Sequence, residues 1–254
     1  MYSYNTRIGY SDCGADNKLK LNALVNLFQN CSTFEGEATG VGVKELMSKG
    51  RGWLLASWQI MIERLPNQSE NVEVTTEAYE FKGFYGKRNF YMKDENKNVL
   101  AYADSIWFYY DIKNHHPVKY EYKEGEGFQL SAGYPMKKAG RKIILPTDFN
   151  DECIKGERFR IKKSALDTNG HTNNSEYIKF AADYLPDIPV REFPEVKMIR
   201  VEYKQAAHLG DTVVPKYYFT KDNHKIYVSL DDEEDKCYAI VEFCDKDGLE
   251  ELEK

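Results

Sequence analysis

The sequence predicts an α+β fold in which one long helix lies among consecutive antiparallel strands, and the arrangement occurs twice. Aromatic residues make up 14% of the 254 positions, with 19 tyrosines and 13 phenylalanines, which favours strands. The order of strand, polar turn, amphipathic helix and run of strands appears in each half of the chain. Such a helix among antiparallel strands indicates a sheet wrapped around it, and two copies should pair as a pseudo-dimer.

The first half should open with a strand at 6–10 and a polar turn at 11–17. A helix follows, because apolar residues recur at spacings of three and four along one face. That face is formed by Leu21, Leu24, Val25, Phe28 and Cys31. A flexible, glycine-containing passage then leads to four expected strands, at 53–65, 71–81, 86–93 and 99–111.

Residues 113–157 are rich in Lys, Gly, Glu and Pro, and we interpret most of them as a connection over the surface. We place the first domain at 1–130, and the linker with the second domain at 131–254.

The second half repeats the order of the first, with a strand at 158–162 and a polar turn at 167–171. A helix over 173–185 should end before Pro186. Its apolar face would contain Tyr177, Ile178, Ala181 and Tyr184. The remaining strands are expected at 197–206, 211–219, 225–230 and 237–244.

Composition argues against several classes of protein. No apolar run approaches the roughly 20 residues of a membrane helix, and the start of the sequence has no apolar signal segment. The formal charge of −6 argues against a nucleic-acid-binding protein. Five scattered cysteines without CxxC spacing predict reduced thiols in the cytoplasm, with no disulfide framework and no zinc site.

The densest polar cluster runs from Asp167 to Asn174, just before the second helix. Asp167 could orient or activate a water, His171 could shuttle a proton, and Asn169 could hold the water or a carbonyl. The helix N-terminus offers N–H groups to a developing oxyanion. Ordinary turn and cap chemistry, with Asn173 or Asn174 as N-cap, is the alternative interpretation.

The first half provides an internal comparison. We match Ser11-Asp12 with Leu166-Asp167, and Leu24 with Tyr177, which requires two extra residues in the first copy. The first copy then keeps an aspartate but has no histidine. This asymmetry predicts that only the second half is catalytically active.

The motif Asp167-x-Asn169-x-His171-x-Asn173-Asn174-x-x-Tyr177-Ile178 resembles that of the acyl-acyl carrier protein thioesterases, a hotdog-fold family. Other stretches resemble the family's strands, at 58–66, 72–76, 86–91, 103–107 and 201–204. The resemblance implies two tandem hotdog domains, each an antiparallel sheet wrapped round a central helix, that hydrolyse fatty acyl-carrier-protein thioesters. Asp167, Asn169 and His171 would be catalytic, the first domain would house the acyl chain, and no metal or cofactor is implied.

The sequence departs from the family's pattern after Tyr203. Plant members have a glutamate and a cysteine, both with assigned catalytic roles, where this chain has Ala206 and Ala207. Gln205 could still orient a water by hydrogen bonding. The alternative is a shifted register in which Glu202 supplies the missing acid.

Several aromatic residues of the first half could line an acyl tunnel, although core packing explains them equally well. These residues are Trp53, Trp58, Phe81, Phe84 and Trp107.

A basic stretch on this acidic protein could bind an acyl carrier protein, which is strongly acidic, or could be a solvated linker. It consists of Lys137, Lys138, Arg141, Lys142, Arg158, Arg160, Lys162 and Lys163. His208 could approach the site, but a solvated turn residue is the favoured interpretation, and we expect His115 and His116 to lie in an exposed loop. The sequence leaves a homodimer open.

Two other functions compete with the carrier-protein thioesterase. One is an acyl-CoA thioesterase of the hotdog class. The other is a non-catalytic acyl-binding or carrier-protein-binding module, which the missing glutamate keeps open.

Overall fold

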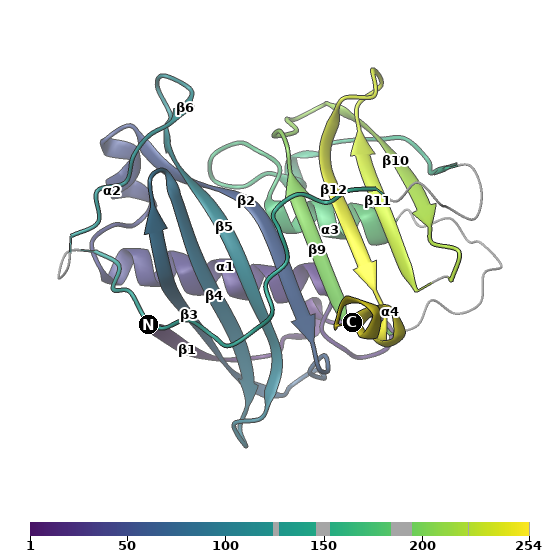
Figure 1. The fold of residues 1–254 in the computed structure, drawn as a ribbon, viewed down its shortest axis with the longest axis horizontal. Coiled ribbons are helices and arrows are strands. Elements are labelled where there is room, and N and C mark those ends of the chain that lie inside the picture. Colours follow the sequence, from purple (N-terminus) through teal and green to yellow (C-terminus); the bar gives the residue numbers. More distant parts are fainter. Residues whose placement is uncertain (124–126, 146–152, 184–194, 223, 254) are drawn as a thin grey trace. The chain divides into compact units, whose positions relative to one another are not determined.

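We describe the chain from a computed structural model, which describes residues 1–123, 127–145, 153–183, 195–222 and 224–253. The chain divides into two compact units, Met1–Ala139 and Gly140–Lys254, and each contains an antiparallel sheet and few helices (Figure 1). The predicted α+β class is therefore confirmed. Among the described helices, none has the length and apolar character needed to cross a membrane.

The first unit has a sheet of strand order β1-β3-β4-β5-β2, and the short β6 pairs with β5. The strands are β1 (Tyr2–Arg7), β2 (Arg51–Ile62), β3 (Asn71–Lys82), β4 (Tyr85–Asp94), β5 (Val99–Asp111) and β6 (His116–Pro117). The helical elements are the 3₁₀ turn η1 (Tyr10–Asp12), α1 (Leu21–Ala38) and α2 (Val43–Ser48).

The second unit has the strand order β9-β12-β11-β10-β7, and the short β8 also pairs with β10. The strands are β7 (Ile154–Lys155), β8 (Phe159–Arg160), β9 (Met198–Tyr203), β10 (Thr212–Phe219), β11 (Lys225–Asp231) and β12 (Cys237–Cys244). The helical elements are η2 (Lys163–Ala165), α3 (Asn174–Asp183) and α4 (Lys246–Glu253).

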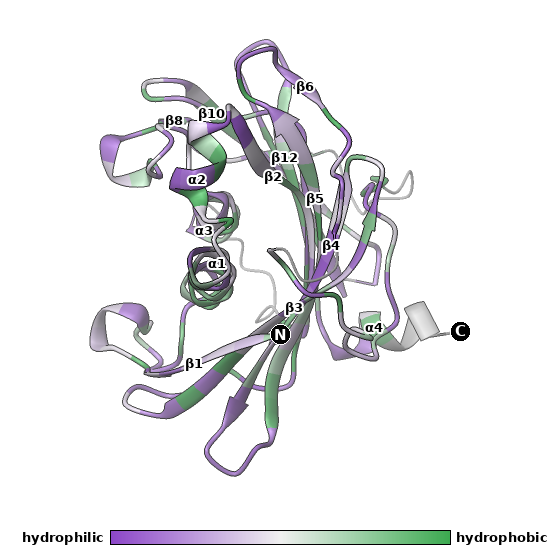
Figure 2. Cartoon of the chain, turned by 90° about the vertical axis from the view of Figure 1, so that its left-hand side faces the viewer, coloured by the Kyte–Doolittle hydropathy of each residue, from purple (hydrophilic) through white to green (hydrophobic). Residues whose placement is uncertain are grey.

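In each unit the helix that follows the polar turn packs on the sheet with the predicted face. Helix α1 contacts β1 and β3, and Figure 2 views it nearly end-on beside the strands of its unit. Leu24, Val25, Phe28 and Cys31 are fully buried on that face, whereas Leu21 is only half-buried.

Helix α3 contacts β11 and β12 and buries Tyr177, Ile178 and Ala181. The fourth predicted position, Tyr184, lies outside the described residues, as does the predicted end of the helix.

Four predicted strands are wrong in extent, because pairing partners decide where a strand ends; those expected at 53–65 and 197–206 end at Ile62 and Tyr203. The first was expected at 6–10, but β1 ends at Arg7, opposite Asn71, where β3 begins. The strand expected at 158–162 is reduced to Phe159–Arg160, which pairs only with Thr212 and Val213. The strands at 99–111 and 237–244 have the predicted bounds.

The passage after α1 contains a short helix, α2, where we expected only flexible chain. Gly50 follows it with φ of +65°, a left-handed conformation that glycine adopts without strain, and its N–H donates to the carbonyl of Met47 (2.9 Å). The glycine therefore terminates the helix. The prediction also missed α4.

The connection after β6 is held against the outer faces of the sheets by side chains. In the first unit, Gln59 donates to the carbonyl of Lys137 (3.0 Å), and the buried Asp104 lies 3.7 Å from the Nζ of Lys138. In the second unit, Arg200 donates to the carbonyls of Gly140 and Lys142. Residues 127–145 are thus an ordered part of both units, whereas 146–152 lie outside the described residues.

Candidate active site

Three of the four residues predicted to act in catalysis, Asp167, Asn169 and His171, lie in a tight loop that joins η2 to α3. Leu166 and Thr172 close the loop as an antiparallel bridge. Inside it, the N–H of Asp167 donates to the carbonyl of His171 (2.7 Å), and the N–H of Gly170 donates to that of Asp167 (3.1 Å). Gly170 has φ of +77°, a left-handed conformation that glycine adopts without strain.

The carboxylate of Asp167 fixes the shape of this loop. Its Oδ1 accepts the backbone N–H groups of Asn169 (2.8 Å) and His171 (3.1 Å), and its Oδ2 lies 3.5 Å from the Asn169 amide nitrogen. The side chains of Asn169 and His171 are exposed. Asp167 therefore positions the backbone of His171, while the imidazole itself is accessible from solvent.

The loop is joined to the segment after β9 through Ala207. The carbonyl of Ala207 accepts the N–H (3.1 Å) and the hydroxyl (2.8 Å) of Thr172, and its N–H donates to the hydroxyl oxygen of Tyr177 (2.8 Å). Tyr203 donates its hydroxyl to the carbonyl of Asn174 (2.9 Å) at the start of α3. Burial raises the pKa of both tyrosines, so their phenols stay neutral hydrogen-bonding groups.

Gln205 lies in this same segment, two residues before the Ala207 contact. Its backbone N–H donates to the carbonyl of Tyr238 (3.2 Å), and its side chain is half-buried; Ala206, where the plant members have glutamate, is exposed. The segment therefore offers the reaction no carboxylate at 204–208.

Glu202 binds residues of the connection that follows β6. It is 5% exposed, and its carboxylate accepts the N–H of Ile143 (3.0 Å) and lies 3.3 Å from the guanidinium of Arg141. Since neighbours along a strand point to opposite faces, Glu202 faces away from α3, toward which Tyr203 points. The structure thus argues against Glu202 as the missing acid.

The N-terminus of α3 has the cap that the turn interpretation expected. The side chain of Asn173 accepts the N–H of Ser175 (3.1 Å), and the N–H of Glu176 donates to the carbonyl of Asn173 (2.9 Å). Two of the N–H groups that we assigned to an oxyanion are therefore already bonded within the chain.

His208, which the sequence predicted to be a solvated turn residue that could approach the site, lies beside His171. The rings of His208 and His171 lie on the two segments that the Ala207–Thr172 contact joins, with their centroids 5.2 Å apart and their planes at 69°. His208 is exposed, as expected of a turn residue. The Ala207–Thr172 contact that brings the two rings together is not visible in the sequence.

The corresponding loop of the first unit corrects our alignment of the two halves. The N–H of Gly14 donates to the carbonyl of Lys18 (2.9 Å), and the N–H of Asn17 to that of Gly14 (3.0 Å). These are the bonds that Asp167, His171 and Gly170 make in the second unit. Gly14 therefore corresponds to Asp167, and Lys18 to His171.

The same register continues into the helix without insertions. Lys20 donates its N–H to Asp12, as Asn173 does to Ala165, so Asp12 matches Ala165 rather than Asp167. The two extra residues that we inserted in the first copy are not needed. The first unit has neither the carboxylate nor the imidazole at the matching places.

Four of the five aromatic residues predicted to line an acyl tunnel fall into two clusters of the first unit, and the fifth, Phe84, is exposed. Trp58 is 2% exposed and packs against Phe28 of α1, at 6.2 Å between ring centroids, and 6.5 Å from Trp107. Trp53 is half-buried and contacts Phe81 at 5.7 Å. Within the described chain, the indole N–H groups of Trp53 and Trp58 are buried without a hydrogen-bond partner.

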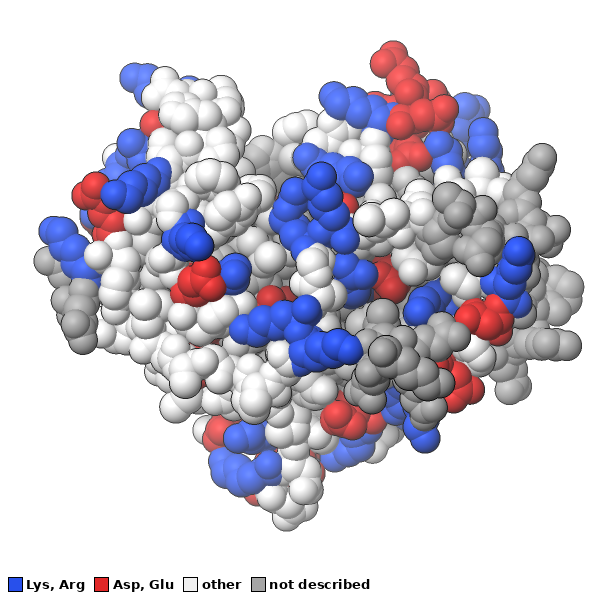
Figure 3. Space-filling view, viewed as in Figure 1, with Lys and Arg blue, Asp and Glu red and all other residues white. Residues whose placement is uncertain are grey.

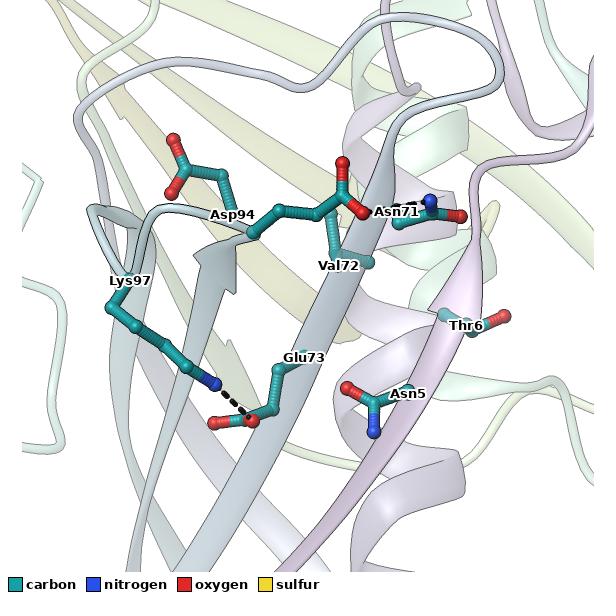
Figure 4. Close-up of a pocket in the computed structure, with 8 residues that line it drawn as sticks. Asn5, Thr6, Asn71, Val72, Glu73, Asp94 and Lys97 are labelled. Carbon is teal, nitrogen blue, oxygen red and sulfur yellow. Dashed lines mark hydrogen bonds and ion pairs between the residues drawn. The ribbon is translucent and has the colours of Figure 1, made fainter.

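A surface hollow of the first unit contains none of the predicted catalytic residues (Figure 4). Lys97 donates to the carboxylate of Glu73 (2.7 Å), and the amide of Asn71 donates to the carboxylate of Glu95 (3.1 Å). Three of the charged side chains that line the hollow thus already have partners within the chain. The hollow is lined by Asn5, Thr6, Asn71, Val72, Glu73, Asp94, Glu95 and Lys97. The described residues include no group of three or more His, Cys, Asp or Glu side chains that could hold a metal ion.

Family models match both parts of the chain. The model of the acyl-ACP thioesterase N-terminal domain matches residues 1–123, and that of the C-terminal domain matches residues 150–243. The chain belongs to the acyl-ACP thioesterase family.

Individual relatives agree with this assignment. The chain is 24% identical over 217 residues to a chloroplastic palmitoyl-acyl carrier protein thioesterase of Gossypium hirsutum, a match that covers 81% of this chain and 52% of the relative. The chain thus spans about half the length of the curated relatives that it matches.

Solved structures share the fold. An acyl-ACP thioesterase from Bacteroides thetaiotaomicron superposes with a TM-score of 0.82 at 19% identity, covering 95% of this chain and 96% of that one. The 12:0-ACP thioesterase of Umbellularia californica gives a TM-score of 0.74 at 14% identity, covering 95% of both chains.

In this member of the acyl-ACP thioesterase family, the structure places Asp167, Asn169 and His171 in one loop and joins that loop to the segment containing Gln205. Glu202 instead binds Ile143 and Arg141 of the connection between the units' sheets, and His208 lies beside His171. The family motif identified Asp167, Asn169 and His171 from the sequence. The position of His208 depends on the contact between Ala207 and Thr172.

Proposed function

We propose that this chain hydrolyses fatty acyl-acyl carrier protein thioesters to free fatty acid and carrier protein. The observation that carries the proposal is the His171 loop: a carboxylate holds the backbone of an exposed imidazole beside the start of α3. Membership of the family supports it, as do the names of relatives that act on palmitoyl- and 12:0-acyl carrier protein.

The two units would be two hotdog domains with divided tasks. Each has a sheet, a tight loop with the same hydrogen bonds and one helix packed on the sheet, which supports the tandem interpretation. The second unit would carry the chemistry, because Gly14 and Lys18 stand where it has Asp167 and His171. The first unit, predicted to span 1–130, would bind the acyl chain through the side chains around Trp53 and Phe81.

In the proposed reaction a water attacks the thioester carbonyl and gives a proton to His171. Asp167 holds the N–H groups of Asn169 and His171, and its negative charge would stabilise the imidazolium that forms when His171 takes the proton. The exposed Asn169 amide would hold the water or the carbonyl oxygen, and Gln205 would orient the water from the segment after β9. No metal or diffusible cofactor has a role.

The carrier protein would dock on basic side chains near the His171 loop. Arg160, Lys162 and Lys163 are exposed, and they flank Ile161, whose backbone bonds Gly210 and Asp211 on the His208 segment. Lys138 and Arg141 suit this role less well, because they pair with Asp104 and Glu202. Figure 3 shows basic side chains on the face where residues 131–145 run in Figure 1.

We also propose a cytoplasmic location. All five cysteines are free thiols, as is usual in a reducing compartment. The plant relatives, by contrast, are named as chloroplastic.

The test is turnover of matched acyl-carrier-protein and acyl-CoA substrates that carry the same acyl chains. We expect free fatty acid from the carrier-protein substrates, at a kcat/KM at least about tenfold above that for the CoA thioesters. Faster turnover of the CoA thioesters would support the acyl-CoA thioesterase. Binding without turnover of either would support an acyl-binding module.

A further inference from the structure

The His171 loop faces a second imidazole, that of His208. Their ring centroids are 5.2 Å apart with the planes at 69°, and both side chains are exposed. Both rings would therefore be accessible to a thioester delivered to the His171 loop.

Hydrogen bonds on both sides fix the position of His208 in the second unit. Before it, the carbonyl of Ala207 accepts both donors of Thr172. After it, the carboxylate of Asp211 accepts the N–H of His208 (2.8 Å) and Gly210 donates to the carbonyl of Ile161 (3.0 Å). These bonds involve the backbones of Ala207, His208 and Gly210, and none of them involves the imidazole ring of His208.

Hydrolysis of a thioester needs two proton transfers: one from the attacking water and one to the departing sulfur. The chain has alanine at the two positions, 206 and 207, where plant members have a glutamate and a cysteine. Among residues 204–210, all of which the structure describes, His208 is the one histidine, aspartate, glutamate or cysteine, and histidine is the side chain that most often transfers protons in catalysis.

We propose that His208 is a second catalytic acid–base residue that protonates the leaving sulfur, an inference that rests on the proposed function. As the water oxygen bonds to the carbonyl carbon, His171 takes a proton from the water. As the C–S bond breaks, its electron pair leaves on sulfur, which takes a proton from the His208 imidazolium. The proton now on His171 passes to His208, directly or through one water, and restores both rings.

The test compares two thioesters of one acyl chain: an alkyl thioester of N-acetylcysteamine and an aryl thioester whose thiolate leaves without a proton. The full chain carrying His208→Gln should lose at least about tenfold in kcat/KM on the alkyl thioester and less than about threefold on the aryl thioester. His208→Asn should behave likewise, and His171→Ala should lose activity on both. His116→Gln, which alters an exposed histidine of the first unit, is the control and should change neither.

Equal losses on both thioesters with the His208 variants would show a structural role and overturn the inference, as would no loss on either. Failure of the proposed function would give other results. The unmodified chain would release no fatty acid from any carrier-protein substrate, or the His171→Ala variant would have the same kcat/KM as the unmodified chain on both thioesters.

Discussion

Gly14 takes in the first unit the place that Asp167 takes in the second. Each N–H donates to the carbonyl four residues on, at 2.9 Å to Lys18 and 2.7 Å to His171. The two loops therefore share a backbone conformation, although the second unit has a carboxylate and an imidazole where the first unit has Gly14 and Lys18. Asp16, by accepting the N–H of Lys18 (3.0 Å), supplies part of what Asp167 does for its own loop.

The missing plant-type carboxylate makes a prediction about Gln205. Gln205→Ala should cost about 1–3 kcal/mol in transition-state stabilisation, measured as kcat/KM, the scale of one lost buried hydrogen bond. Gln205→Glu should be tolerated, because a carboxylate also accepts from water and has nearly the same volume.

Glu202→Gln is the matched comparison, because Glu202 lies three residues earlier and binds Arg141 and Ile143. It should lower the free energy of unfolding with little change in kcat. A large loss of kcat at Glu202 together with none at Gln205 would restore the shifted register.

The proposed docking surface predicts a salt dependence. Raising the salt concentration should increase KM for the carrier-protein substrate much more than for a short thioester, because screening weakens attraction between exposed charges. Lys162→Glu with Lys163→Glu should have the same effect, with kcat nearly unchanged.

Lys119→Glu is the control for charge alone, since Lys119 is exposed in the first unit. The same rise in KM from Lys119→Glu, or an equal salt effect on both substrates, would assign the basic residues to solvation.

The two tryptophan clusters predict different consequences of truncation. Trp58→Ala should lower the free energy of unfolding by about 3–5 kcal/mol, measured by denaturant titration, because Trp58 is 2% exposed beneath α1. Trp53→Ala should cost less stability, because Trp53 is half-buried, and should instead raise KM for long acyl chains. An unchanged ratio of KM values between long and short chains would remove Trp53 from the acyl-binding surface.

The sequence predicted the bounds of the strands at 99–111 and 237–244 correctly, because most residues of these two strands are apolar or aromatic. It failed for β1 and β8, since the extent of a short strand is decided by its partner. It also failed for α2, a helix of six residues that has too few turns to show periodicity.

The candidate site divides in the same way. The motif identified Asp167, Asn169 and His171, which are close in the chain. The alignment of the halves was wrong because we matched aspartates, whereas the backbone bonds of Gly14 and Lys20 determine the register. The position of His208 depends on the contact between Ala207 and Thr172, which are 35 residues apart in the sequence. A pattern of neighbouring residues cannot predict such a long-range contact.

The central claim is that the His171 loop of the second unit performs the hydrolysis, and a comparison of two aspartates tests it most directly. Asp167 accepts two backbone N–H groups in its loop and Asp16 accepts one, and an asparagine oxygen can still accept these bonds, so both loops should keep their conformation in the Asp167→Asn and Asp16→Asn variants. We predict that Asp167→Asn lowers kcat on acyl-carrier protein by about 100-fold or more, as His171→Ala should, while Asp16→Asn leaves kcat within a few-fold. Equal losses of kcat from Asp16→Asn and Asp167→Asn would contradict the account.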